Sequence, residues 1–354
     1  MRDSRAPHPS RASGLPLAQL GEAGLIATLL DAQPPPSGGL GIGDDAALIP
    51  LPEARLVTSV DALVEDVHFR RNTCSAEDLG WKALAVNLSD LAAMGARPTA
   101  ALLVLSLPSA LPAAWVNDFH RGFLALAQAH GVWLAGGDTT GSPGPIMVSV
   151  TVFGVPGAQL LRRDQAKPGD QLFLTGVPGR SAAGFQLLER PQDHQTLPDA
   201  WQDSLRQAHL RPVPQIAAGL ALAAGGARVA LLDDSDGLAC SLQHLAAASQ
   251  VAVILEESAL PACPARDAVA RTRGVAPLEG MLNGGEDYHL VGCCAPDDRA
   301  CIEAALRESG TPSFWVGEVV SPERGVTSGA WLRGLNGALH RLDGPMGYRH
   351  FGEG

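Results

Sequence analysis

The chain has 354 residues, with a hydrophobic fraction of 46%, a charged fraction of 18% and a formal net charge of −11 at pH 7. This length favours two domains, and this composition is typical of a globular protein that can bury a large core. An acidic chain lacks the basic face that a nucleic-acid-binding protein needs, and no apolar run is long enough to span a membrane.

The N-terminal residues 1–16 are rich in Pro, Ser and Arg and contain no apolar stretch. We interpret them as a disordered extension and not as a secretory signal. The six cysteines form no C-x-x-C pair, which favours buried, reduced thiols in a cytoplasmic protein over zinc or redox sites. They are Cys74, Cys240, Cys263, Cys293, Cys294 and Cys301.

Hydrophobic periodicity predicts alternating helices and strands in the first half of the chain. The predicted helices cover residues 17–30, 75–94 and 112–130, and the predicted strands cover residues 56–61, 101–107, 132–135 and 146–155. The second of these helices has Ser75 as a candidate N-cap and Gly95 as its end, and it is apolar nearly all round, which indicates burial. We place a domain boundary after residue 156, where the last strand ends.

The second half is also predicted to alternate, which indicates a layered α/β domain over residues 157–354. Strands are expected over residues 171–175, 229–232, 251–255, 288–293, 314–316 and 330–332, and helices over residues 181–188, 216–224, 238–248 and 299–308. The polar stretch 190–202 is predicted to be a surface loop.

Acidic clusters recur along the chain, most of them next to glycines or hydroxyl residues. They are Gly43-Asp44-Asp45, Ser59 with Asp61, Asn87 with Asp90, Gly136-Gly137-Asp138, Asp233-Asp234-Ser235-Asp236 and Gly285-Glu286-Asp287. We interpret Gly136-Gly137 as a turn at a strand end, and Ser235 or Asp236 as the cap of the following helix. A fold that gathers these carboxylates would require bound cations at neutral pH.

The common nucleotide-binding and hydrolase signatures are absent from the sequence. There is no Walker A loop, no G-x-G-x-x-G, no kinase H-R-D or D-F-G set, no G-x-S-x-G and no H-E-x-x-H. The remaining signal is a large number of hard oxygen ligands, which Mg²⁺ prefers. Because Mg²⁺ held by carboxylates most often binds a polyphosphate, phosphoryl transfer is the hypothesis that the residues favour.

Six motifs in order resemble the thiamine-monophosphate kinase family. They are residues 41–47, residues 82–96, Gly136-Gly137-Asp138-Thr139-Thr140, Ser235-Asp236-Gly237-Leu238, Gly284-Gly285-Glu286-Asp287-Tyr288 and residues 347–351. The resemblance covers roughly residues 17–351 and extends to the superfamily of aminoimidazole-ribonucleotide and selenophosphate synthetases. It implies an enzyme that uses ATP and several Mg²⁺ ions to phosphorylate thiamine monophosphate to thiamine diphosphate. It also implies a homodimer in which the mixed-sheet domains, residues 17–156, pair into a barrel beside the active site.

The resemblance also implies roles for individual residues. The implied Mg²⁺ ligands are Asp45, Ser59, Asp61, Asp90, Asp138, Asp233 and Asp236. The implied ATP contacts are Gly137, Asp138, Arg163 and Ser235, and the implied thiamine-phosphate contacts are His68, Glu286 and Tyr348. Two positions depart from the pattern: Val60, where relatives can carry a hydroxyl residue, and the extra Asp234. Whether Asp44 and Asp234 bind metal stays open.

The chemistry of this reaction explains the many acids. The attacking group is a phosphate oxygen that is already ionised, so no general base or covalent acceptor is expected, and transfer is in line. The alternatives are another ATP-using synthetase of the superfamily or a non-catalytic Mg-nucleotide-binding protein. A selenophosphate synthetase would need a reactive Cys and a Lys near its N-terminal glycines, but no Cys precedes Cys74 and no Lys precedes Lys82.

Overall fold

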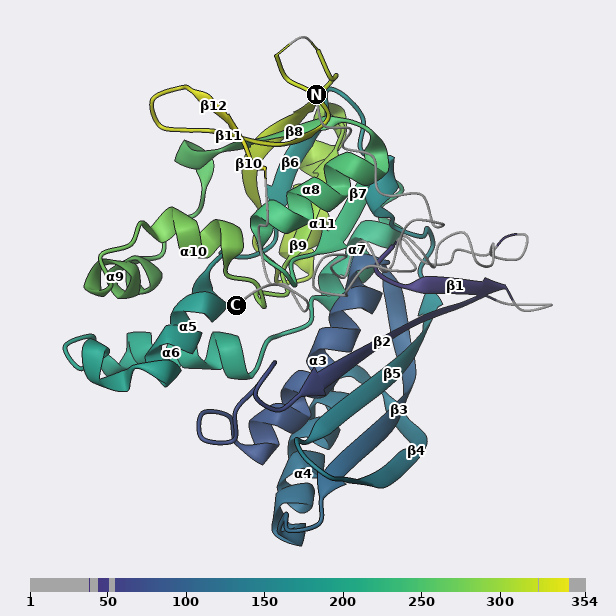
Figure 1. Cartoon of the computed structure of the whole chain (residues 1–354). Coiled ribbons are helices and arrows are strands. Elements are labelled where there is room, and N and C mark those ends of the chain that lie inside the picture. Colours follow the sequence, from purple (N-terminus) through teal and green to yellow (C-terminus); the bar gives the residue numbers. More distant parts are fainter. Residues whose placement is uncertain (1–37, 39–43, 51–54, 324, 344–354) are drawn as a thin grey trace, which may run out of the picture.

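The computed structural model describes residues 38, 44–50, 55–323 and 325–343 (Figure 1). The predicted N-terminal extension, the predicted helix 17–30 and Tyr348 lie outside the described residues. Two sheets with their helices make up the described chain, a five-stranded sheet within residues 47–156 and a seven-stranded sheet within residues 171–341. This mixed architecture confirms the predicted α/β fold class.

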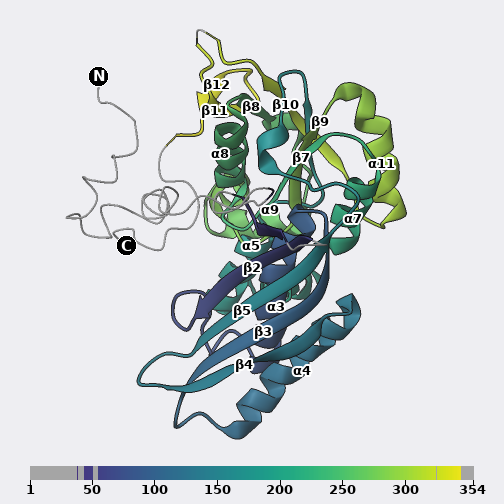
Figure 2. The same cartoon turned by 90° about the vertical axis from the view of Figure 1, so that its right-hand side faces the viewer.

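The five-stranded sheet has a mixed strand order. The order is β1 (Ala47–Pro50), β2 (Arg55–Val64), β5 (Met147–Pro156), β3 (Ala96–Pro108) and β4 (Trp133–Ser142). Neighbouring strands are antiparallel except β3 and β4, which are parallel. The helices α3 (Ala76–Ala93) and α4 (Ala113–His130) pack together against one face of this sheet (Figure 2).

Helix α3 is the central element of the first half and runs close to its predicted limits. Its N-cap Ser75 accepts a hydrogen bond from the backbone N–H of Asp78 at 3.1 Å, and the chain leaves the helix at Gly95 with φ of 63°. Leu84, Leu88 and Leu91 are fully buried, and most of the remaining side chains of the helix are buried too. The predicted burial of this helix is therefore confirmed.

The face of the five-stranded sheet opposite to α3 carries exposed apolar side chains. These are Val60, Leu102, Trp133, Met147 and Val155, and we call them the open face. Val60 is 59% exposed and Trp133 is 69% exposed. An apolar sheet face of this kind is unusual on a monomer and marks an interaction site.

The expected turn at Gly136-Gly137 is wrong, because these residues lie inside β4. They continue the parallel ladder with β3, in which Gly137 is opposite Leu103 and Asp138 is opposite Val104. A Cβ atom on Gly137 would lie 1.7 Å from the backbone oxygen of Leu103. Gly137 is required here because the backbones of β3 and β4 approach closely. The glycine pair that suggested a turn is therefore explained by strand packing.

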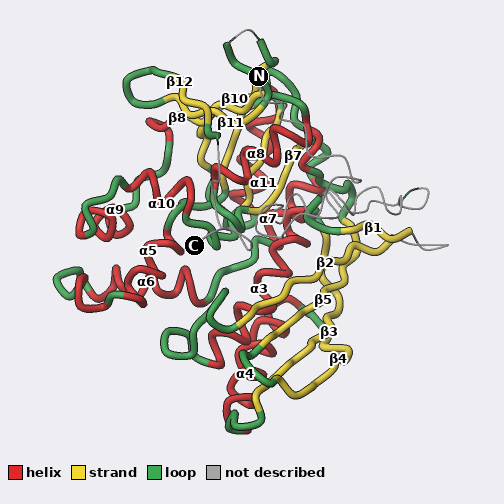
Figure 3. The backbone as a smooth tube through the Cα atoms, viewed as in Figure 1, coloured by secondary structure: helices red, strands yellow, loops and turns green. Residues whose placement is uncertain are grey.

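The seven-stranded sheet is mixed and carries helices on both faces (Figure 3). Its order is β12 (Leu339–Arg341), β11 (Gly329–Arg333), β8 (Ala252–Glu256), β10 (Phe314–Val320), β6 (Gln171–Leu174), β9 (Leu290–Cys294) and β7 (Val229–Asp233). The helices α7 (Ile216–Ala224) and α11 (Arg299–Glu308) share a core with one face, and α8 (Leu238–Ser249) shares a core with the other. The adjacent residues Cys293 and Cys294 of β9 belong to these two different cores.

A group of helices beside this sheet was only partly predicted. It contains α5 (Arg180–Glu189), α6 (Asp199–Leu210), α9 (Pro264–Thr272) and α10 (Pro277–Asn283). Most residues of the stretch 190–202 are exposed, as expected, but part of it is helical, because it contains a 3₁₀ turn (Pro191–His194) and the start of α6. His194 and Gln202 are buried in this group, so polar residues that suggested solvent exposure instead make internal hydrogen bonds.

Two further expectations concern the cysteines and membranes. All six cysteines are unpaired; Cys74, Cys293 and Cys294 are buried as expected, whereas Cys301 is exposed. Within the described part of the chain, every helix is too short or too polar to cross a lipid bilayer.

Candidate functional site

Three carboxylates from distant parts of the sequence meet between the two sheets. Asp45 precedes β1, Asp90 lies on the last turn of α3, and Asp233 ends β7. One oxygen atom from each lies within 4.8 Å of the others. We call these three residues the carboxylate cluster. Its formation confirms that the acidic motifs of the two halves converge.

The hydroxyl groups around the carboxylate cluster hold its side chains in place. Ser59 on β2 donates a hydrogen bond to Asp90 Oδ2 at 2.6 Å, and Ser89 donates to Asp233 Oδ2 at 2.5 Å. Oδ2 of Asp45 is buried and has no hydrogen-bond partner among the described residues. Burial raises the pKa of Asp90, and the charges of Asp61, Asp233 and Asp45 raise this pKa further.

Arg163, in the 3₁₀ turn Arg163–Gln165, is the cation that contacts the carboxylate cluster. Its guanidinium pairs with Asp45 and lies 3.3 Å from Asp44 Oδ1. Burial also raises the pKa of Asp45, against the lowering effect of Arg163. One guanidinium offsets one of several buried carboxylates, so the cluster retains the charge and the oxygen ligands that favour a divalent cation.

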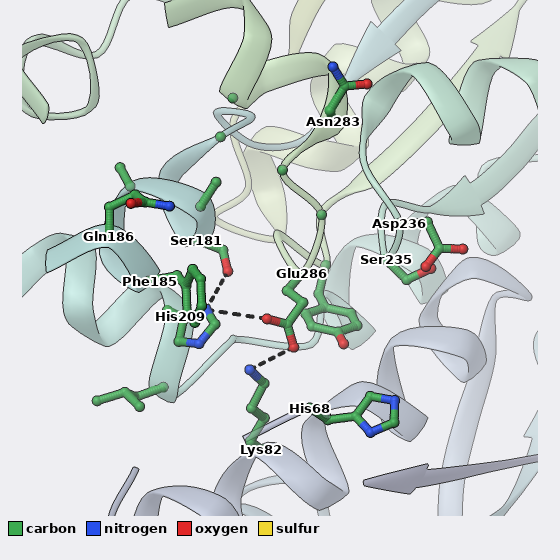
Figure 4. Close-up of a pocket in the computed structure, with 18 of the residues that line it drawn as sticks. His68, Lys82, Ser181, Phe185, Gln186, His209, Ser235, Asp236, Asn283 and Glu286 are labelled. Carbon is green, nitrogen blue, oxygen red and sulfur yellow. Dashed lines mark hydrogen bonds and ion pairs between the residues drawn. The ribbon is translucent and has the colours of Figure 1, made fainter. Parts of the chain in front are cut away.

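A second set of side chains lies across the same cavity (Figure 4). Lys82 Nζ on α3 is 2.7 Å from Glu286 Oε1, and His209 Nδ1 at the end of α6 is 3.3 Å from Glu286 Oε2. His209 Nδ1 is also 3.0 Å from the hydroxyl of Ser181 on α5. Burial alone would raise the pKa of Glu286, but the charges of Lys82 and His209, the hydrogen bond from Lys82 and the charge of His68 together hold this pKa below its usual value.

The loop that carries Glu286 is bound to the loop that follows Asp233. The backbone N–H of Glu286 donates to Ser235 O at 2.6 Å, and that of Tyr288 donates to Asp234 O at 2.9 Å. Glu286 has φ of 58° and Tyr288 has φ of 50°, a left-handed conformation that non-glycine residues rarely adopt. These two strained residues are held by the neighbouring loop, which indicates a functional position for Glu286.

Ser235 and Asp236 do not cap helix α8, contrary to the expectation. The N-cap is Gly237, and no side chain makes the capping hydrogen bond. Ser235 and Asp236 instead line the cavity (Figure 4). Helix capping therefore does not explain these two polar residues, and their place in the cavity wall favours a role in binding.

A single cavity of about 660 Å³ joins the carboxylate cluster to the Lys82–Glu286 pair. Its lining includes Asp61, His68, Lys82, Asp90, Asp233, Ser235, Asp236, Glu286 and Tyr288. His68 is positioned by the backbone N–H of Val64, which donates to His68 Nδ1 at 3.0 Å. Asp61 is oriented through its backbone N–H, which donates to Asn87 Oδ1 at 2.9 Å.

Asp138 and Gly137 are not part of this cavity. Asp138 is opposite Val104 on β3, Val104 is opposite Ser149 on β5, and Ser149 is opposite Ala62 on β2. Residues opposite each other across strands share a face, and successive residues alternate. Asp138 therefore lies on the face of Ala62, whereas Asp61 and Ser59 point to the other face, toward Asp90. Within one chain, Asp138 is separated from the carboxylate cluster by the sheet.

Sequence reasoning missed the roles of Lys82, His209 and Ser181. Lys82 carried a signal, because it is one of only two lysines and lies on a helix expected to be buried. His209 and Ser181 had no local signal. Ser181 contacts His209, and His209 contacts Glu286, because α5 and α6 pack side by side.

The chain is similar to known enzymes over most of its length. Residues 43–156 match the family model described as AIR synthase related protein, N-terminal domain, and residues 167–328 match the corresponding C-terminal domain model. The chain is 39% identical over 317 residues to thiamine-monophosphate kinase of Escherichia coli strain K12, a match that covers 88% of this chain and 92% of that protein. It is 35% identical over 323 residues to thiamine-monophosphate kinase of Rhodopirellula baltica, with coverage of 89% and 92%.

A solved structure described as AaThiL complexed with AMPPCP and TMP has a similar fold. Its TM-score is 0.80 at 29% sequence identity, and the match covers 96% of this chain and all of that one (100%). The similarity therefore extends over both sheets and over the cavity between them.

Proposed function

Because the chain belongs to the thiamine-monophosphate kinase family, we propose that this kinase transfers the γ-phosphoryl group of ATP to thiamine monophosphate by direct in-line attack. The observation that supports it most is the continuous cavity between the carboxylate cluster and the Lys82–Glu286 pair. One end suits a metal polyphosphate and the other suits an organic cation. The related AaThiL structure was solved with both AMPPCP and TMP, which is consistent with two adjoining sites.

The carboxylate cluster has the donors that Mg²⁺ requires. Its three carboxylates lie close together and are at least partly buried, and Oδ2 of Asp45 has no hydrogen-bond partner among the described residues. We propose that Asp45, Asp90 and Asp233, with Ser59, Asp61 and Asp236 around them, hold several Mg²⁺ ions. When bound, these ions neutralise the charge of ATP and of the acceptor phosphate.

The residues of the chain supply positioning and electrostatics. The acceptor phosphate oxygen is ionised at neutral pH, so no side chain has to remove a proton. We propose that Arg163 and Ser235 contact ATP, Arg163 by exchanging part of its pairing with Asp45 for a phosphate.

The thiamine-phosphate end is assigned to His68, Glu286 and Tyr348. Lys82 keeps Glu286 ionised, so that its carboxylate attracts the cationic thiazolium ring. Tyr348 lies outside the described residues, and its proposed contact rests on the family resemblance. An aromatic face beside this cation contributes about 0.5–2 kcal/mol.

The open face supports a homodimer. Its exposed apolar side chains, which include Val60 and Trp133, would be buried in an interface with another protein surface. A second copy of the chain can supply that surface if the two sheets pair. Asp138 lies on this face. We propose that Asp138 and Gly137 act across the dimer, so that Asp138 of one protomer completes the metal and ATP site of the other.

The ATP requirement and the six unpaired cysteines favour the cytoplasm as the place of the reaction.

A coupled assay of ATP consumption tests the proposed function. Thiamine monophosphate, the precursor of aminoimidazole ribonucleotide and selenide are offered separately. Turnover with thiamine monophosphate alone, with thiamine diphosphate as product, is expected. Turnover with one of the other two acceptors and none with thiamine monophosphate would assign the chain to another reaction of the superfamily, and no turnover with any would indicate a binding protein.

A further inference from the structure

Three polar side chains, two of them buried, form a second group on the other side of the Asp233 loop. Asp234 follows Asp233 and is directed away from the carboxylate cluster toward α8, where its Oδ1 accepts a hydrogen bond from Ser241 at 2.7 Å. His289 precedes β9, and Asp287 lies two residues before it. Each of Asp234, Asp287 and His289 offers one ligand atom within 4.8 Å of the other two.

Several polar atoms of this group have no hydrogen-bond partner within the described chain. Asp234 is 0% exposed and His289 is 3% exposed. Oδ2 of Asp234 and both ring nitrogens of His289 have no hydrogen-bond partner among the described residues. Buried polar atoms in folded proteins nearly always have a partner, so Asp234 Oδ2 and the neighbouring imidazole of His289 point to a missing ligand.

The charge of the group is not offset by a paired cation. In the described part of the chain, no Lys or Arg forms an ion pair with Asp234 or Asp287, and Asp234 Oδ2 lies 3.6 Å from His289 Nε2. The fully buried carboxylate of Asp234, with the partly buried carboxylate of Asp287 beside it, is costly without a cation.

We propose that Asp234, Asp287 and His289 bind one transition-metal dication, with Zn²⁺ as the best match, at a site separate from the carboxylate cluster. The donor set of one imidazole and two carboxylates suits a borderline metal ion better than Mg²⁺. Two ligands of a tetrahedral zinc ion with bonds of about 2.0–2.2 Å are roughly 3.3 Å apart. The separation of 3.6 Å between His289 Nε2 and Asp234 Oδ2 is longer than a hydrogen bond and close to this value.

The surroundings of the ligands support the site. Metal-binding carboxylates are normally held by hydrogen bonds from a surrounding shell. Ser241 holds Asp234, and the backbone N–H groups of Gly179 and Ser181 donate to Asp287. The fourth position is left for water. The ion joins the loop after β7 to the loop before β9, and both loops line the cavity of the proposed active site.

The test is zinc binding by the full chain in excess Mg²⁺, which occupies the carboxylate cluster. Protein freed of metal with a chelator is incubated with Zn²⁺ and desalted, and its zinc content is measured. The ligand variants are Asp234→Asn and His289→Gln. The matched controls are Asp45→Asn, in the other cluster, and Cys240→Ser, whose thiol lies 3.8 Å from His244 Nε2 and offers an alternative zinc site.

We expect one equivalent of zinc in the wild type and in both controls, and none in the ligand variants. Zinc should also raise the melting temperature of the wild type by several degrees but not that of His289→Gln. Equal zinc retention by His289→Gln, loss of zinc in Cys240→Ser, or no zinc in the wild type would overturn the proposal. Anomalous diffraction from wild-type crystals at the zinc edge locates the zinc ion without any variant. A peak among these three side chains supports the site, and a peak elsewhere contradicts it.

Discussion

Lys82 Nζ lies 2.7 Å from Glu286 Oε1 and links helix α3 of the first half to the loop before β9 in the second half. The Lys82 side chain is 2% exposed, so its ammonium group depends on this carboxylate for its solvation. The pair helps to keep Glu286 ionised at the cavity wall.

Lys82→Met should therefore weaken substrate binding and stability together. We expect the KM for thiamine monophosphate to rise about tenfold and the KM for ATP to change less, because Glu286 loses both its position and its charge. The free energy of unfolding should fall by about 1–3 kcal/mol, less than for a fully buried pair because Glu286 is partly exposed. Steady-state kinetics and urea denaturation measure the two effects.

Two comparisons make this prediction specific. Lys167→Met removes the other lysine, which is exposed, and should leave both quantities nearly unchanged. Lys82→Met combined with Glu286→Gln should recover part of the stability but none of the substrate affinity. Simple additivity of the two stability changes would show that the residues do not act as a pair.

Asp90→Asn should abolish turnover while the fold is kept. The wild type is expected to need Mg²⁺ in the millimolar range and to lose activity in excess chelator. In metal-free buffer the variant should be more stable than the wild type by about 1–2 kcal/mol, because one buried carboxylate charge has been removed. Asp203→Asn, on the surface of α6, should change stability by less than about 0.5 kcal/mol. Full activity of Asp90→Asn, or of the wild type without Mg²⁺, would refute the metal assignment.

His209 should make the protein less stable in acid. Burial, then the charge of Lys82, lowers the pKa of His209 to about 4 from an unfolded value of 6.5. Between these two values the unfolded chain binds more protons than the folded chain, so the free energy of unfolding falls as pH drops from about 6.5 toward 4. The full effect of this shift is about 3 kcal/mol.

The His209 contribution is isolated by comparing His209→Gln with the wild type in urea at about pH 7, 6 and 5. The variant should lose less stability over this range. His340→Gln, on the exposed strand β12, serves as the control and should follow the wild type. Parallel pH profiles for His209→Gln and the wild type would contradict the assignment.

Asp138 offers a direct test of the dimer. Light scattering should report a dimer, and Asp138→Asn and Asp90→Asn should each be inactive alone. In a mixed dimer of the two, one site contains both defects and the other contains neither, if Asp138 acts across the interface. Co-expression of the two variants should then restore about a quarter of wild-type activity, given random pairing. No recovery would show that Asp138 acts within its own chain or has no role in the site.

Many helices and strands could be predicted from local sequence patterns, because the conformation that these patterns favour is also the one that tertiary packing requires. Helix α3 has a Ser75 cap, a buried stripe and Gly95 at its end, and it forms close to its predicted limits. The helices α9 and α10 were missed because they are short and contain polar residues such as Arg266, which is buried and donates to Pro178 O. Their burial depends on partners that no sequence window contains.

The acidic residues of the site were predictable and their neighbours were not. The apolar helix around Asp90 indicated a buried carboxylate that needs a partner or a metal, but its hydrogen bond from Ser59 was not predicted from local patterns. The placement of Asp138 depends on strand register, which the Gly136-Gly137 pattern concealed. His209 contacts Glu286 because α5 and α6 pack together, and no short stretch of sequence around either residue indicates this contact.

The adjacent cysteines of β9 have a consequence for following this protein as it unfolds. Cys293 and Cys294 point to opposite faces of one strand, so each thiol is enclosed by a different core. Burial raises the pKa of Cys294 to about 12 and that of Cys293 in the same direction, so both thiols stay protonated and unreactive in the folded chain. A pulse of an alkylating reagent therefore reports, at two consecutive positions of one peptide, whether the two faces of the seven-stranded sheet open together or in sequence.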